Sequence, residues 1–306
     1  MLRFHPAGFI QKPLTTDLGV MVYYTNAETP AIGTPTLVFL HSLGGGSSAF
    51  EWCRVYPALA DTYRVVAPDL IGWGQSSHPV RTYRVEDYFT MITQLLTSLE
   101  GPRLVAATSL TAGVMVRLAI QRPDLCQGLF LVSPAGNSDF GRDYRLSLPA
   151  LLASTPGVDR LLYQVGAANP LAVQWFLSNV LLGDRRRLTP TLVQAYLSCT
   201  QQPQAQYAAL ASLSGAISFD LANYIGQLSL PTAVILGEKS RFMPPAVGRR
   251  LASLNPPGHH HRPRNPRCRC AAPPGTPRGG GAPPARLRRD GFSLPSGPMT
   301  NRPPQG

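Results

Sequence analysis

Ser109 is the residue of this sequence best placed for covalent chemistry. It lies where a β-rich apolar run, residues 103–107, meets a helical pattern that begins at Leu110. A serine hydroxyl attacks an acyl carbon readily only when a base, usually a histidine held by a carboxylate, accepts its proton. A serine at such a junction also often caps the following helix, so a structural role is the alternative. The strand-to-helix context favours the nucleophile position.

Short apolar runs predict the strands that would position this serine. They are residues 36–40, 64–67, 103–107, 129–133 and 232–236. Between them, residues 86–99 and 110–121 space their apolar side chains at helical intervals. Because strands and helices alternate, the sequence predicts an α/β fold with a mostly parallel, doubly wound sheet covered on both faces.

The chain divides into regions of different pattern. Residues 1–136 predict the first part of the sheet core, and residues 137–227 predict a helical insertion without a strong strand. Residues 228–255 return to the strand-then-helix pattern and complete the core. Residues 256–306 are rich in Pro, Arg and Gly and predict a disordered tail.

A glycine-rich turn carries a resemblance to a known family. The segment 68–79 reads Pro-Asp-Leu-Ile-Gly-Trp-Gly-Gln-Ser-Ser-His-Pro and resembles the D-x-x-G-x-G-x-S turn of α/β-hydrolases. His41-Ser-Leu-Gly44 precedes it and Ser109 follows it in the order typical of that superfamily. The resemblance covers residues 15 to 255 and implies an α/β-hydrolase fold with a helical lid. The alternative is an unrelated doubly wound fold, but no strand is followed by the G-x-G-x-x-G of dinucleotide-binding domains.

The resemblance also assigns roles around the nucleophile. The family's G-x-S-x-G elbow reads Ala107-Thr-Ser-Leu-Thr111 here, with Thr111 bulkier than the usual glycine. By analogy, the backbone N–H groups of Leu43 and Leu110 form the oxyanion hole. His41 is expected to tie the loop down, and Ser42 replaces the usual glycine. We expect Ser109 to face a pocket formed with Leu43, Trp73 and side chains of the lid.

The acid and the histidine of a catalytic triad are not identifiable. The family's G-x-x-D reads Gly237-Glu-Lys-Ser240, so Ser240 stands at the usual acid position. Glu238 and Asp139 are weaker candidates, Asp139 corresponding to an alternative acid position that some members use. The histidine should follow a further strand, but the sequence enters the Pro/Arg tail, where His259, His260 and His261 lack a preceding strand pattern. The C-terminal strand and helix are therefore predicted to be missing.

Most of the net positive charge of the chain lies in residues 256–306. Of the +12 carried by the chain, +8 comes from the nine arginines, less Asp290, in residues 256–306. The abrupt loss of periodicity after Asn255 suggests that these residues are read out of frame, and the alternative is a genuine basic tail. The tail has no aromatic platforms for bases, so we expect no nucleic-acid partner.

The family resemblance implies a function class. The nearest activity is serine ester-type hydrolysis of small apolar acyl compounds, and the alternative is a catalytically degenerate pseudo-hydrolase that serves as a binding or scaffold protein. No cofactor or metal is implied. Because no signal peptide and no apolar run of about 18 residues is found, we expect a cytoplasmic protein without a membrane span. Six lid residues are expected to line the pocket, and the alternative at their helical spacing is packing within the lid itself: Leu151, Leu152, Leu161, Trp175, Phe176 and Leu181.

The composition of the tail predicts that it adds little to stability. We expect removal of residues 258–306 to leave the melting temperature nearly unchanged, because a segment this poor in apolar residues buries little surface. Thermal unfolding of the full and shortened chains measures this, with limited proteolysis expected to cut the tail before the body. A clear drop in melting temperature on truncation would show that the tail packs on the body.

Overall fold

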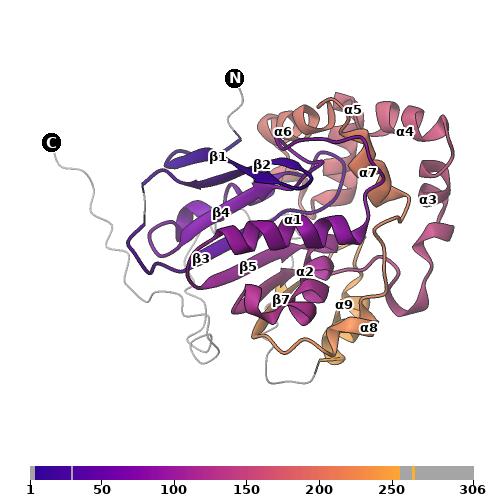
Figure 1. Ribbon diagram of the computed structural model, residues 1–306. Coiled ribbons are helices and arrows are strands. Elements are labelled where there is room, and N and C mark those ends of the chain that lie inside the picture. The colour runs from indigo at the N-terminus through magenta and orange to yellow at the C-terminus, as the bar shows by residue number, and fades with distance from the viewer. Residues whose placement is uncertain (1–3, 29, 256–263, 266–306) are drawn as a thin grey trace.

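The computed structural model describes residues 4–28, 30–255 and 264–265, which form one mixed sheet with helices around it (Figure 1). The strand order is β1-β2-β4-β3-β5-β6-β7-β8. The strands β1 and β2 run antiparallel to their neighbours, and the pairs from β4 to β8 are parallel. The strands are Phe9–Thr16, Gly19–Asn26, Thr36–Leu40, Arg64–Asp69, Arg103–Thr108, Gly128–Val132, Thr232–Gly237 and Arg264–Asn265.

The predicted parallel core is confirmed. The strands β4, β3, β5, β6 and β7 are adjacent, and their bounds lie within two residues of the predicted runs. The hairpin of β1 and β2 was not predicted. In β1 only the end residues, Phe9 and Thr16, are buried, so the strand shows no apolar alternation along its length.

Alternate residues of the strands pack into two separate cores. On one face, Val38, Val105 and Leu131 pack against the helices α1 (Val85–Ser98) and α2 (Ser109–Gln121), with α8 (Ala222–Ile225) and α9 (Pro245–Ser253) contributing to the same core. On the other face, Phe39 and Val65 pack with the short helices η1 (Ala49–Trp52) and η2 (Tyr56–Leu59). This two-sided burial explains the continuous apolar runs from which the strands were predicted.

The insertion after β6 is helical, as predicted. Figure 1 shows its main helices, α3 to α7, gathered at one end of the sheet. Within the described part of the chain, no helix is long and apolar enough to cross a membrane. The elements of the insertion are η4 (Asp139–Gly141), η5 (Tyr144–Leu146), α3 (Leu148–Ala153), α4 (Val158–Gly166), α5 (Pro170–Phe176), the π-helical η6 (Leu177–Leu181), η7 (Arg185–Arg187), α6 (Pro190–Thr200) and α7 (Gln206–Leu213).

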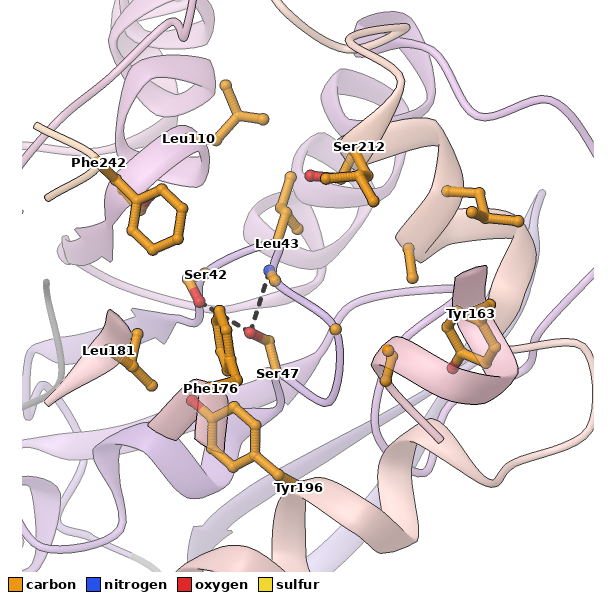
Figure 2. A pocket seen from close by; sticks show the side chains of 18 of the residues that line it. Ser42, Leu43, Ser47, Leu110, Tyr163, Phe176, Leu181, Tyr196, Ser212 and Phe242 are labelled. Carbon is orange, nitrogen blue, oxygen red and sulfur yellow. Dashed lines mark hydrogen bonds between the residues drawn. The ribbon is translucent and has the colours of Figure 1, made fainter. Parts of the chain in front are cut away.

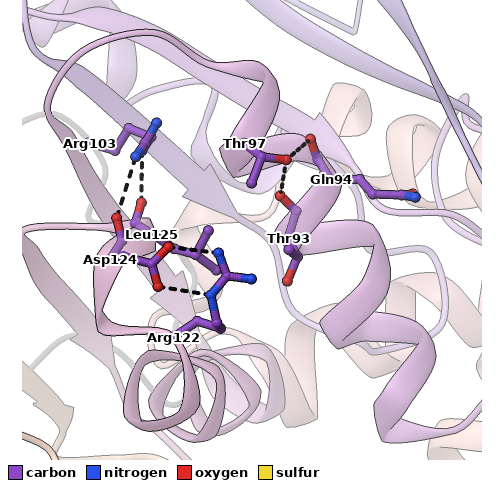
Figure 3. Close-up of polar contacts among 7 residues, drawn as sticks. All are labelled: Thr93, Gln94, Thr97, Arg103, Arg122, Asp124 and Leu125. Carbon is purple, nitrogen blue, oxygen red and sulfur yellow. Dashed lines mark hydrogen bonds and ion pairs between the residues drawn. The ribbon is translucent and has the colours of Figure 1, made fainter.

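One arginine fixes the start of the strand that leads to Ser109. Arg103 begins β5, and its guanidinium donates to the carbonyl of Leu99, after α1, at 2.7 Å and to that of Leu125 at 2.8 Å. Leu125 belongs to η3 (Pro123–Leu125), which follows α2. Figure 3 shows this guanidinium next to the Arg122–Asp124 ion pair. The bonds join the ends of α1 and α2 to the first residue of β5.

The last strand is very short. The strand β8 has two residues, which pair with Leu236 and Gly237 at the end of β7. Arg264 and Asn265 fall in the segment predicted to be disordered, so for these two residues the prediction is wrong. The other residues of that segment lie outside the described ones. Leu104, Phe130 and Ile235 are only half-buried on the adjoining face of the sheet. A full-length last strand, predicted to be missing, is not found in the described part of the chain.

The packing of α2 on the chain after β6 predicts that glycine is more favourable than alanine at position 113, the reverse of their usual order in a helix. A Cβ added at Gly113 would lie 2.2 Å from the carbonyl oxygen of Ala135. Alanine in a helix is normally more favourable than glycine by about 1 kcal/mol, but relieving this overlap costs about 1–3 kcal/mol. We therefore expect Gly113→Ala to lower the free energy of unfolding in denaturant titrations.

The matched control is Gly166→Ala in α4. There the nearest atom to the added Cβ is 3.8 Å away, so this substitution should leave stability unchanged or slightly higher. Equal stabilisation by both substitutions would contradict the close approach of α2 to Ala135.

Candidate active site

Ser109 sits at a sharp turn between β5 and α2. Its φ is +55°, in the left-handed region that residues other than glycine rarely adopt. Its carbonyl accepts a hydrogen bond from the N–H of Ala135 at 3.2 Å. Thr111, two residues later, is fully buried, so the turn accommodates a side chain where the family pattern has glycine. A left-handed residue between a strand and a helix is the backbone form that a nucleophile elbow requires.

A cavity of about 300 Å³ lies at the carboxyl ends of the parallel strands, and Ser109 is part of its wall. Its core side is formed by loops that follow β3, β5 and β6, represented by Leu43, Ser109 and Asn137. The insertion covers the cavity with residues that include Phe176, Leu181, Tyr163, Tyr196 and Leu213. Figure 2 shows Phe176, Leu181, Tyr163 and Tyr196 around the loop that carries Ser42 and Ser47.

The two predicted oxyanion-hole residues line the same cavity as Ser109. Leu43 follows β3, and its backbone N–H has no hydrogen-bond acceptor among the described residues. Leu110 lies in the first turn of α2, where backbone N–H groups have no acceptor four residues earlier in the helix. The structure therefore brings Leu43, Leu110 and Ser109 to the wall of one cavity.

A polar chain at one side of the cavity was missed by the sequence analysis. The N–H of Gly44 donates to Ser47 Oγ at 3.1 Å, and Ser47 Oγ lies 2.8 Å from Ser42 Oγ. Ser42 donates from its hydroxyl and its N–H to Glu51 at 2.7 and 2.9 Å. Tyr196 of α6 donates to Glu51 Oε1 at 3.1 Å. Ser42 in place of glycine was the signal in the sequence, but Glu51 belongs to no motif.

His41 is a structural residue, in agreement with the expectation from the sequence. It is fully buried, and its Nε2 accepts the N–H of Leu70 at 3.0 Å. Its Nδ1 therefore carries the proton and donates to the carbonyl of Ser42 at 2.6 Å. Both ring nitrogens are used to join the loop after β3 to the turn after β4, so His41 is not available to deprotonate Ser109.

The D-x-x-G-x-G-x-S turn, residues 69–76 at the end of β4, supports the loop after β3. Asp69 is fully buried and accepts the N–H groups of Ala49 at 2.7 Å and Gln75 at 2.8 Å. Burial raises the pKa of Asp69, while His41 and these hydrogen bonds act in the opposite direction. A Cβ at Gly74 would lie 2.2 Å from the Asp69 carboxyl carbon, so only glycine leaves room for this carboxylate. The motif thus supports the site without entering the cavity.

The expectation that Trp73 would line the pocket is wrong. The indole is buried and donates from Nε1 to the hydroxyl of Tyr88 at 3.1 Å. It packs beneath the loop, with its ring edge-on to His41 at 6.2 Å. The hydrogen bond to α1 directs Trp73 into the core.

Asp139 is buried in the loop after β6, and its carboxylate accepts hydrogen bonds from backbone N–H groups. It accepts the N–H of Gly136 at 3.1 Å and that of Leu221 at 2.9 Å. Burial raises the pKa of this carboxyl, and the two N–H donors oppose that shift. Through these two hydrogen bonds, Asp139 joins the start of the insertion to its end. Asp139 is not among the residues that line the cavity, whereas Asn137 is.

Ser240 lies in the turn after β7, at the usual acid position. Its hydroxyl accepts the N–H of Met243 at 3.0 Å, and its own N–H donates to Gly237 at 3.1 Å. These bonds stabilise the turn that leads to α9. Glu238 beside it is exposed. Phe242, two residues further on, reaches the cavity and lines it.

No hydrogen bond joins Ser109 to any of the histidines that the structure describes. His5 bonds to the carbonyl of Pro6, and His41 is used as described above. Burial lowers the pKa of His78, which follows the turn after β4. His259, His260 and His261 lie outside the described residues.

Only part of the predicted lid lining is confirmed. Phe176 and Leu181 line the cavity, and Leu162 and Tyr163 of α4 line it as well. The other four predicted residues are exposed on the outer surface of the insertion, so for them the expectation is wrong: Leu151 (50%), Leu152 (40%), Leu161 (61%) and Trp175 (62%). Helical spacing identified an apolar stripe on each helix but not which side of the helix faces the core.

The cysteines and acids of the described residues do not suggest a metal site. Cys53, Cys126 and Cys199 are free thiols, and burial raises the pKa of Cys126 to about 11. No group of three or more His, Cys, Asp or Glu side chains in the described part of the chain could hold a metal ion.

Known proteins share the sequence pattern of this chain. A family model described as alpha/beta hydrolase fold matches residues 35–265. The uncharacterized protein Rv2715 of Mycobacterium tuberculosis is 35% identical over 140 residues, which is 45% of this chain but only 40% of that relative's length. The uncharacterized hydrolase YugF of Bacillus subtilis is 27% identical over 237 residues, covering 76% of this chain and 82% of the relative.

Solved structures share the fold. A serine hydrolase involved in carbazole degradation superimposes with a TM-score of 0.67 at 16% sequence identity. The match covers 85% of this chain and 91% of that protein. At this identity the likeness establishes the fold and leaves the substrate open.

The left-handed backbone at Ser109 predicts different effects for two small substitutions. Replacing Ser109 with glycine relieves a conformation that costs other residues about 1–2 kcal/mol, whereas alanine retains that cost. Because glycine also loses about 0.5–1 kcal/mol through chain entropy, we expect Ser109→Gly to be more stable than Ser109→Ala by about 1 kcal/mol. Denaturant unfolding of the two variants measures the difference. If Ser109→Ala were the more stable variant, the turn would not be strained.

Proposed function

The chain belongs to the α/β-hydrolase fold family, and from this premise we propose that it binds small apolar acyl compounds at Ser109, with serine ester-type hydrolysis as its nearest activity. The observation that supports this most is the strained turn at Ser109, which lies in the wall of a cavity also lined by Leu43 and Leu110. A serine that only capped α2 would not require a left-handed backbone.

The cavity favours small and mostly apolar acyl groups. Its volume of about 300 Å³ is at the lower end of the range for small-molecule sites. Phe176, Leu181 and Leu213 supply apolar walls from the insertion, and Phe242 supplies one from the turn after β7. An acyl chain of a few carbons loses its contact with water in such a pocket, which favours binding.

The reaction would proceed through a tetrahedral intermediate. The Oγ of Ser109 forms a bond to the acyl carbon, and the carbonyl oxygen becomes negatively charged. The N–H groups of Leu43 and Leu110 would donate to this oxygen. The hydroxyl proton of Ser109 passes to water, and a proton from water reaches the leaving oxygen as the intermediate collapses. The alcohol is released and an ester remains on Ser109, which a second water molecule then hydrolyses.

We infer that this reaction is slow. In a serine triad a carboxylate orients the histidine and stabilises its protonated form. Ser240 stands at that position, and its hydroxyl accepts the N–H of Met243 instead. A hydroxyl cannot supply the negative charge, so binding and the oxyanion hole account for most of the rate in this proposal.

Two substitutions at Leu43 separate the contribution of its backbone N–H from that of its side chain. Leu43→Pro removes the backbone N–H, and Leu43→Ala keeps it. We expect the proline variant to lose about 10²–10³ in the turnover of para-nitrophenyl butyrate, and the alanine variant to lose much less. Thermal unfolding of both variants checks that the loop after β3 still folds.

The same assay defines the part played by Ser109. If turnover is limited to what binding and the oxyanion hole provide, about 10³–10⁴ over water, water attacks the bound acyl carbon about as readily as the unactivated serine does, and Ser109→Ala changes turnover only slightly. A large loss on Ser109→Ala would show that a base activates the serine, and the inference of slow turnover would be wrong. If the full chain gave no turnover above the uncatalysed rate, the proposed hydrolysis would be replaced by the pseudo-hydrolase alternative.

A further inference from the structure

Glu51 is the single charged residue among the described residues that line the cavity. It belongs to η1 and is only 7% exposed. No arginine or lysine of the described chain lines the cavity with it. A buried carboxylate in an otherwise uncharged pocket affects every ligand that carries charge, because the surrounding protein screens it more weakly than water does.

The hydrogen bonds around Glu51 have a fixed direction. At one end of the chain the N–H of Gly44 can only donate, so it occupies Ser47 Oγ as an acceptor. Ser42 gives its hydroxyl proton to Glu51, so Ser47 must donate to Ser42 across the 2.8 Å between their oxygens. With the N–H of Ser42 and the hydroxyl of Tyr196 also donating, every bond ends on Glu51 as an acceptor. Such a role fits an ionised carboxylate.

The carboxylate retains capacity for one more donor. Oε1 accepts the hydroxyls of Ser42 and Tyr196. Among the described residues, Oε2 accepts only the N–H of Ser42. A carboxylate oxygen can accept about two hydrogen bonds, so Oε2 is half used. A ligand that ends in an ammonium or a hydroxyl group can fill the remaining position, and a ligand that ends in a carboxylate cannot.

We propose that Glu51 makes the cavity discriminate by charge, accepting acyl groups that are neutral or carry a terminal ammonium or hydroxyl group and rejecting those that carry a carboxylate. The inference rests on the proposed function, since it assumes that the cavity takes acyl compounds. It adds a specificity-determining residue that lies outside the nucleophile and the oxyanion hole.

The test measures binding, so that it does not depend on turnover. Three anilides share one framework and differ at the end of the acyl chain: butyranilide is neutral, succinanilic acid is anionic and γ-aminobutyranilide is cationic at neutral pH. Isothermal titration calorimetry with the full chain gives the three dissociation constants. We expect succinanilic acid to bind at least about tenfold more weakly than butyranilide, because two like charges meet in a poorly screened site. The aminobutyranilide should bind at least as tightly as butyranilide.

The variant Glu51→Gln removes the charge and keeps the shape of the side chain. We expect it to bring the affinities for butyranilide and succinanilic acid to within about threefold of each other. The matched control is Glu238→Gln, which removes the same charge from an exposed residue in the turn after β7 that does not line the cavity. This control should keep the discrimination of the unmodified chain.

The outcomes separate this inference from the proposed hydrolysis. The expected order of affinities without any ester turnover supports the role of Glu51 and contradicts the hydrolase activity. Turnover of para-nitrophenyl butyrate with equal affinities for the three anilides overturns the role of Glu51 and leaves the hydrolase activity standing. If Glu51→Gln does not fold, the affinities of the unmodified chain still decide, and tight binding of succinanilic acid or no binding of any anilide overturns the inference.

Discussion

The left-handed backbone at Ser109 depends on contacts that α2 makes with the chain after β6. The N–H of Ala135 bonds to the carbonyl of Ser109, and Gly113 lets the first turns of α2 approach Ala135 closely. At the other end of β5, the hydrogen bonds of Arg103 to Leu99 and Leu125 hold the start of the strand. The position of the serine hydroxyl in the cavity, and with it the whole candidate site, follows from this packing.

The parts of the fold that the sequence predicted are those governed by local pattern. Strands buried on both faces appear as short apolar runs, so β3 to β7 and their parallel pairing in one sheet could be derived. The turn from Asp69 to Ser76 could be recognised because its residues are fixed by backbone geometry, as the contact of Gly74 with the Asp69 carboxylate illustrates. The hairpin of β1 and β2 was missed because β1 is exposed along most of its length.

The cavity was harder to predict because it is made by residues far apart in the sequence. Glu51 and Tyr196 meet across 145 positions, and neither residue belongs to a pattern that would announce the contact. Apolar spacing in the insertion likewise placed Trp175 and Leu161 in the pocket, whereas both lie on the outer surface. Tertiary packing decides which of the apolar side chains of a lid helix face inward, and the spacing of those residues alone did not identify them.

The central claim is that Ser109 presents its hydroxyl to the cavity. Labelling with an alkyl fluorophosphonate, followed by mass spectrometry of the intact chain and its peptides, tests this directly because the reagent bonds to a serine oxygen that can reach it within the site. The account predicts one adduct per chain on the peptide that contains Ser109, lost in Ser109→Ala and slowed by an excess of butyranilide. No adduct, or an adduct on another residue that persists in Ser109→Ala, would contradict it.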